Sequence, residues 1–318
     1  MFNAVKIAIN TFRESIREPV FCLLLMFALF LIGHFPAIAL FVFFDEMKMV
    51  VDSSMATTLL FGLFAAVLTS SHTVTQEMRN GTVLLLMSKP VHRWSFVVAK
   101  IVGVAAALVL MVFIMNCATV VSCYVVGMFR HNMGIYYVYL LLMILAAGWG
   151  MLLNYFRGTS FAAGTVVALA LLFGLFAAYC IIFREPLDKV ALTDLLKALV
   201  LLFCAVTAMS TIAVVCALKL EMVANLTVCA VVFFLGMVSS YLFSRQTGSE
   251  ILDGILQAFY AFFPNWQFFW LADAIAMEVP IPGSYIAKSV LYMLMYITMV
   301  SIWGVVLFNR REIAQDSR

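Results

Sequence analysis

The sequence QEMRNGTVLLLMSKPVHRWSF, residues 76–96, is the longest polar interruption in the first half of an otherwise apolar chain. It contains five consecutive apolar residues, 83–87, which are too few to cross a bilayer because a spanning helix needs about 20. The run therefore predicts a short helix at or below the membrane surface, between two segments that cross. Gly81 favours the end of the preceding helix, Thr82 can cap the short helix, and Pro90 suits the start of the next one.

The composition excludes a soluble fold. Of 318 residues, 65% are hydrophobic and only 11% are charged, whereas a soluble domain has about 25% charged residues and about 45–50% apolar ones. The seven cysteines fall within apolar segments and form no C-x-x-C pair, so they indicate buried apolar packing rather than disulfides or a zinc site. We therefore expect a polytopic membrane protein.

Eight apolar segments are long enough to span the membrane. They are residues 20–44, 55–75, 97–127, 135–156, 161–183, 195–218, 222–243 and 285–308. Most of the nineteen lysines and arginines fall on one side if both termini are cytoplasmic, and the positive-inside rule then places residues 76–96 in the cytoplasm. We expect an all-α fold and a single transmembrane domain that covers residues 1–318.

Residues 1–18 precede the first span and have a helical pattern of their own. Val5, Ile9, Phe12 and Ile16 recur on one stripe, and polar side chains take the other side. The pattern is typical of a helix that lies in the membrane interface, and Pro19 disfavours the alternative, a simple extension of the first span. The expected interface residues are Lys6, Phe12, Arg13 and Arg17.

The outer loop, residues 244–284, contains two apolar pieces, 251–263 and 266–277, divided by Pro264 and Asn265. Each piece is too short to cross the bilayer. We expect a re-entrant pair of helices that packs on the bundle, with Asn265 as the cap of the second helix.

The run EMRNGTVLLLMSKPVHRWSFVVAK, residues 77–100, resembles a segment of ABC-2 type permeases, the membrane subunits of ATP-binding-cassette exporters. The positions that carry the resemblance are Glu77, Gly81, Thr82, Leu85, Leu86, Ser88, Pro90, Arg93 and Lys100. Residues 10–17 are similar to the family's amphipathic N-terminal helix, residues 264–275 to its outer re-entrant loop, and residues 308–313 to its basic tail. The family usually has six spans, so eight spans indicate an additional pair, which we place between residues 135 and 218.

The resemblance implies a permease subunit of an ABC transporter in the plasma membrane of a prokaryote. Two such subunits, identical or different, would associate with two cytoplasmic ATPases that bind ATP and Mg²⁺, and this chain itself would need no cofactor, metal or nucleic acid. The substrate is expected to be hydrophobic or amphipathic and to be exported. The residues expected to contact the ATPase are Glu77, Arg79, Gly81, Thr82, Val83, Leu84, Leu85, Leu86, Met87, Lys89, Pro90 and Arg93.

No G-x-x-x-x-G-K-[ST] phosphate loop occurs in the sequence, so we expect no ATPase activity on this chain and a motor on another polypeptide. Polar residues inside the spans, His72, Asn116 and Asn154, could line a transport pathway or could form hydrogen bonds between helices. The alternative function is a membrane scaffold that recruits a cytoplasmic partner without transporting anything.

Overall fold

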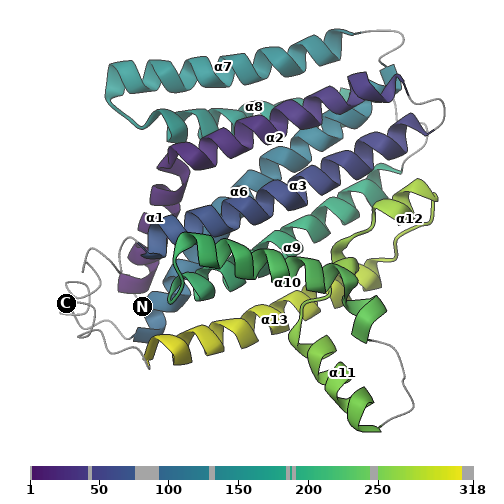
Figure 1. Cartoon of the computed structure of the whole chain (residues 1–318). Coiled ribbons are helices and arrows are strands. Elements are labelled where there is room, and N and C mark those ends of the chain that lie inside the picture. The colour runs from purple at the N-terminus through teal and green to yellow at the C-terminus, as the bar shows by residue number, and fades with distance from the viewer. Residues whose placement is uncertain are drawn as a thin grey trace.

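The computed structural model describes residues 2–41, 45–75, 93–128, 133–183, 187, 191–243 and 250–309 (Figure 1). Within these ranges, eight helices are long and apolar enough to cross a membrane, which confirms the all-α polytopic fold. They are α2 (Pro19–Ala39), α3 (Glu46–Ser70), α6 (Arg93–Met128), α7 (Gly134–Arg157), α8 (Phe161–Phe183), α9 (Leu192–Ala217), α10 (Met222–Phe243) and α13 (Gly283–Asn309). The second span begins nine residues earlier than the sequence predicted, at residue 46 instead of 55.

Helices α3, α6 and α9 form the centre of the bundle, and most of their side chains are buried. The α7–α8 hairpin lies along one edge, while α13 lies along the opposite edge (Figure 1). A side chain at Gly150 of α7 would overlap Thr165 of α8, so the small residue lets the two helices approach closely. The hairpin falls within residues 135–218, where we expected the additional pair, and its status as that pair stays a prediction.

A proline inside α2 determines how this helix packs. Pro36 has no N–H for the carbonyl of Ile32, four residues earlier, and the Ser122 hydroxyl of α6 donates to that carbonyl at 3.0 Å. One turn away, the Tyr139 hydroxyl of α7 donates to the Leu29 carbonyl at 2.6 Å. Two neighbouring helices thus hydrogen-bond to the backbone of α2 near its proline.

Helix α1 (Phe2–Arg17) has three faces. Its apolar stripe is only partly buried: Val5 and Ile9 are exposed, Phe12 is half-buried and Ile16 is buried. The polar stripe, with Lys6, Asn10, Arg13 and Arg17, is exposed. The third face, with Ala8, Thr11 and Ser15, consists of small residues and includes the contact with α6, where a Cβ on Gly103 would lie 2.6 Å from that of Thr11. The exposed apolar stripe fits the predicted interfacial position, since lipid can cover it.

The outer loop forms α11 (Glu250–Phe262), the 3₁₀ turn η2 (Trp266–Phe269) and α12 (Ala272–Ala276). The Asn265 side chain accepts a hydrogen bond from the Gln267 N–H at 3.0 Å, which confirms the predicted cap. The predicted second helix, residues 266–277, is wrong as one helix, because the chain leaves helical geometry at Trp270. Trp266 and Phe269 are buried against the bundle, whereas α11 diverges from it (Figure 1), and its insertion into the outer leaflet stays a prediction.

Candidate functional site

The expected coupling segment, residues 76–92, lies outside the described residues. The sites proposed at Glu77, Arg79, Gly81, Thr82, residues 83–87, Lys89 and Pro90 fall on it and stay predictions. Arg93 begins α6, and its side chain is likewise outside the described part. What the structure gives is the geometry of the two helices on either side of the segment.

Helix α3 continues toward the segment through η1, a π-helical turn at Ser71–Thr75. The Lys100 ammonium of α6 donates to the Thr73 carbonyl of this turn at 3.4 Å. The Lys100 side chain is only 1% exposed, and its ammonium lies 6.0 Å from the centroid of the Phe96 ring. A buried charge is stable only when polar groups or aromatic faces surround it, and here the Thr73 carbonyl and the Phe96 ring do so. The contact between Lys100 and Thr73 therefore joins α6 to the end of α3 next to the segment.

Two further contacts hold this end of the bundle together. On α10, the Asn225 amide donates to Ser71 Oγ of η1 at 2.9 Å and to the Ala213 carbonyl of α9 at 3.2 Å. On α6, the Phe96 ring stacks on Phe308 of α13 with 5.5 Å between centroids. Helices α3, α6, α9, α10 and α13 therefore meet near residues 75 and 93, the described residues on either side of the segment.

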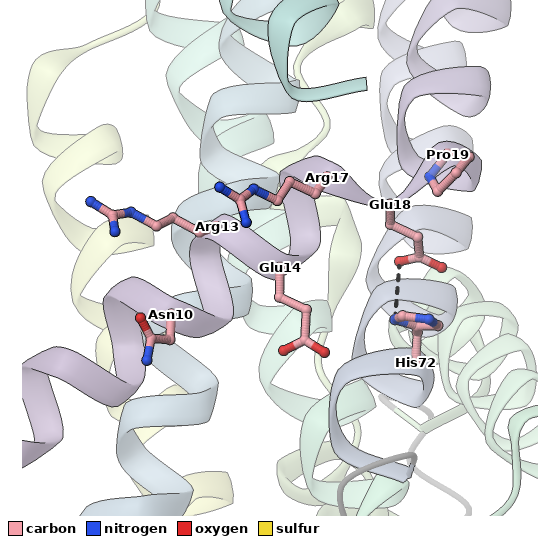
Figure 2. A pocket seen from close by; sticks show the side chains of 7 residues that line it. All are labelled: Asn10, Arg13, Glu14, Arg17, Glu18, Pro19 and His72. Atoms are coloured by element: carbon pink, nitrogen blue, oxygen red, sulfur yellow. Dashed lines mark ion pairs between the residues drawn. The ribbon is translucent and has the colours of Figure 1, made fainter. Parts of the chain in front are cut away.

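A pocket of about 510 Å³ lies beside this end, at the joint between α1 and α2. Its lining comes from α1, the joint and η1: Asn10, Arg13, Glu14, Arg17, Glu18, Pro19 and His72 (Figure 2). His72 was expected as a pathway residue, and the structure places it here, with its Nδ1 3.9 Å from Glu18 Oε2. Burial raises the pKa of the Glu18 carboxyl, the nearby His72 opposes this rise, and the negative charge of Glu14 adds to it.

Both asparagines that the sequence offered as possible pathway residues, Asn116 and Asn154, have hydrogen-bond partners within the chain. The Asn116 side chain of α6 is buried, and its amide donates to the Leu199 carbonyl of α9 at 3.0 Å. This contact is the interhelical hydrogen bond that the sequence allowed as the alternative to pathway lining. Asn154 is exposed at the end of α7, where its amide donates to the Thr159 carbonyl at 2.7 Å and stabilises the turn at Gly158. Among the described residues, neither asparagine lines the pocket that contains His72.

The sequence reasoning missed a polar contact at the start of α9. Lys197 donates to Asp194 Oδ1 at 2.7 Å and to the Ile281 carbonyl at 2.6 Å, and the Ile281 N–H donates to the same carboxylate at 3.3 Å. The pattern D-x-x-K at the start of an apolar helix could have predicted the ion pair. It could not have predicted the contact of Lys197 with Ile281, 84 positions later. This contact fixes the connection between α12 and α13.

Within the described ranges, no group of three or more His, Cys, Asp or Glu side chains gathers closely enough to hold a metal ion. The polar groups at this end of the bundle instead bind backbone carbonyls and one another. Such an arrangement can position helices and transmit movement, and it forms a pocket lined by both acidic and basic side chains.

Comparison with protein families gives one match. Residues 16–156 match a family described as ABC-2 family transporter protein. The matched range begins at the end of α1 and covers α2, α3, the 76–92 segment, α6 and nearly all of α7. Searches of curated proteins and of solved structures found no match.

Proposed function

We propose that this chain, whose residues 16–156 match the family described as ABC-2 family transporter protein, is the membrane subunit of an exporter driven by a separate cytoplasmic ATPase. The family match supports the role of a transporter membrane subunit. The ATPase, the coupling segment and the direction of transport are our proposal. The observation that carries it is the position of residues 76–92, which lie inside the matched range and between two helices joined by Lys100 and Thr73.

A partner that binds residues 76–92 would act on both flanking helices together. The Lys100 contact joins the end of α3 to α6, and Asn225 joins the same turn to α9 and α10. Movement of the segment would therefore shift several spans as a unit, which is how closure of two ATPases could switch the bundle between inward-facing and outward-facing states. The apolar residues 83–87 would insert into a groove of the ATPase, with charged residues around them fixing the register.

An apolar lining inside the bundle supports a hydrophobic or amphipathic substrate. An apolar crevice between α3, α9 and α10 is lined by Leu59, Leu63, Ala205, Val206, Met209, Phe233 and Trp266. Its volume is about 10 Å³, and a site needs at least about 10–15 Å³ to hold a single water molecule. The crevice is closed in this conformation, so a substrate would enter only after the spans move apart.

Assembly and orientation complete the proposal. The resemblance supports two membrane subunits, as a homodimer or heterodimer, with two ATPases in the plasma membrane of a prokaryote. Helix α1 begins and α13 ends at the same end of the bundle as η1 and the start of α6 (Figure 1). Together with the lysine and arginine bias of the sequence, this supports a cytoplasmic position for both termini and for residues 76–92.

The test is co-purification from membranes of the native host. Wild-type chain should bring down a protein with a G-x-x-x-x-G-K-[ST] motif, and the double variant L85D/L86D should release it while the chain stays inserted. The control is V279D, which places the same charge on an exposed residue at the other end of the bundle and should leave the partner bound. If the double variant keeps the ATPase with unchanged hydrolysis, the coupling assignment is wrong. A bound ATPase whose hydrolysis the chain never alters would favour the scaffold function.

A further inference from the structure

The pocket at the joint of α1 and α2 lies where the chain enters the membrane. Pro19 begins the first span, and the side chains that follow it on the surface, Val20 and Leu23, are 42% and 66% exposed. On the α1 side, Val5 and Ile9 are also exposed. Apolar surface of this kind is covered by acyl chains, so the pocket lies at the depth of lipid headgroups.

The buried acid in this pocket lacks a donor. The Glu18 side chain is 9% exposed, and within the described residues its Oε2 atom has no hydrogen-bond partner. The nearest basic atom, His72 Nδ1, is 3.9 Å away, which is too long for a hydrogen bond. Leaving a buried carboxylate oxygen unsatisfied is costly, so the site fits a ligand that brings an N–H donor.

The same pocket also offers positive charge. Arg13 and Arg17 line it from α1, and both side chains are exposed. In Figure 2 the two guanidinium groups extend from one side of the α1 ribbon, and the carboxylates of Glu14 and Glu18 lie toward His72. Among the described residues, no carboxylate forms an ion pair with either guanidinium. Guanidinium groups bind phosphate oxygens in pairs of hydrogen bonds, so this half of the pocket fits a phosphate.

We propose that the pocket binds the headgroup of a phospholipid that carries a primary ammonium. Its phosphate contacts Arg13 and Arg17, and its ammonium donates to Glu18. A volume of about 510 Å³ holds such a headgroup, while its acyl chains lie along Val20 and Leu23. The ligand is zwitterionic because the pocket has one cationic half and one anionic half. The inference concerns lipid binding by this chain and does not rest on the proposed transport function.

The test measures lipid affinity of the purified full-length chain by native mass spectrometry. The probes are phosphatidylethanolamine, its monomethyl and dimethyl derivatives, and phosphatidylcholine, all with the same acyl chains. Each keeps the phosphate, and the series removes N–H donors from the ammonium until none is left. Wild-type chain should bind phosphatidylethanolamine about tenfold more tightly than phosphatidylcholine, the size expected for a hydrogen bond to a charged group. Equal affinities across the series would overturn the proposal without any variant.

Two variants separate the two halves of the site. In E18Q the preference for phosphatidylethanolamine should fall to about parity while phosphatidylcholine binds as before. In the double variant R13Q/R17Q all of these lipids should bind roughly tenfold more weakly with the preference retained. R157Q and E221Q, which change exposed charges at the end of α7 and just before α10, should behave as wild type. A preference that survives E18Q would overturn the assignment of Glu18.

A final probe distinguishes a lipid from a free phosphate compound. Soluble O-phosphoethanolamine has the ammonium and a phosphate monoester in place of the lipid's diester, and no acyl chains. It should bind far more weakly than the lipid because it buries no apolar surface. If it binds as tightly as phosphatidylethanolamine, the ligand is a free phosphomonoester, and the lipid assignment is wrong.

Discussion

The ammonium of Lys100, buried on α6, lies 3.4 Å from the carbonyl oxygen of Thr73 in the π-helical turn at the end of α3. The two residues are 27 positions apart, and the expected coupling segment occupies most of the chain between them. The contact holds together the two helices that flank the segment. The proposal that a partner at the segment moves both helices depends on this contact.

Replacing Lys100 by Met should loosen η1 while the fold persists. Methionine fills a similar volume and removes the charge, so the cost of burying the ammonium disappears together with its hydrogen bond. We expect the backbone amides of residues 71–75 to exchange with deuterium roughly tenfold faster, because local opening of the turn loses one charged hydrogen bond. The matched control is K48M, which removes an exposed lysine near the other end of α3. Unchanged exchange in K100M would show that the contact does not hold the turn.

The contact between Pro36 and Ser122 predicts strong coupling in a double-mutant cycle. S122A should lower the free energy of unfolding by about 1 kcal/mol, because the Ile32 carbonyl loses its donor. In a P36A background the alanine N–H can bond to that carbonyl within α2, so S122A should then cost little. Unfolding of the four proteins in one detergent measures the coupling. Additive effects would mean that the serine does not compensate for the proline.

Substitution of Gly103 should separate α1 from α6. An alanine Cβ there would lie 2.6 Å from Thr11 Cβ and 2.7 Å from the Ala8 carbonyl oxygen, which forces a shift of the backbone. We expect G103A to lower the free energy of unfolding by about 1–3 kcal/mol and to make the α1–α2 joint more sensitive to protease. G127A is the control, because a Cβ at Gly127 meets nothing within 4 Å. Equal protease sensitivity of the two variants would contradict the packing.

The pH dependence of stability should reveal Glu18. Burial raises the pKa of its carboxyl in the folded chain, so the folded state holds the proton more tightly than the unfolded state does. Stability should therefore rise as the pH falls through the raised value and level off below about 4.3, the ordinary value for glutamate.

In detergent free of amine-bearing lipids, E18Q should lack this rise, and it should unfold at a higher temperature than wild type near pH 8. The difference should shrink as the solution is made acidic. E221Q, at an exposed position, serves as the control. A constant difference at all pH values would mean that the Glu18 carboxyl does not titrate in this range.

The sequence predicted the parts of the fold that depend on local chemistry. Long apolar runs gave all eight spans, since length and hydropathy alone decide whether a helix can cross a bilayer. The Asn265 cap also followed from local pattern. The start of α3 was placed too late because Lys48 and Asp52 were read as loop residues, whereas in the structure both lie in the first turns of the helix.

The candidate site depended on contacts between distant residues, which one sequence does not reveal. The sequence pattern placed Glu18 at the end of the N-terminal interfacial helix, and only the structure shows its approach to His72, 54 positions later, and its burial. The sequence allowed Asn116 either to line a pathway or to bond between helices, and only the structure identifies its partner, the Leu199 carbonyl of α9. The spacing of the small residues Ala8, Thr11 and Ser15 indicates close helix packing, but the sequence analysis considered only the apolar and polar stripes of α1.

The most direct test of the central claim is photo-crosslinking from residue 86 in native membranes. The chain would carry a photoreactive phenylalanine analogue in place of Leu86, and mass spectrometry would identify the crosslinked protein. The same analogue at Val279, at the opposite end of the bundle, is the control. The account predicts a crosslink from position 86, and not from position 279, to a polypeptide with a G-x-x-x-x-G-K-[ST] phosphate loop. A crosslink to that ATPase from position 279 alone, or none from either position while the complex co-purifies, would contradict it.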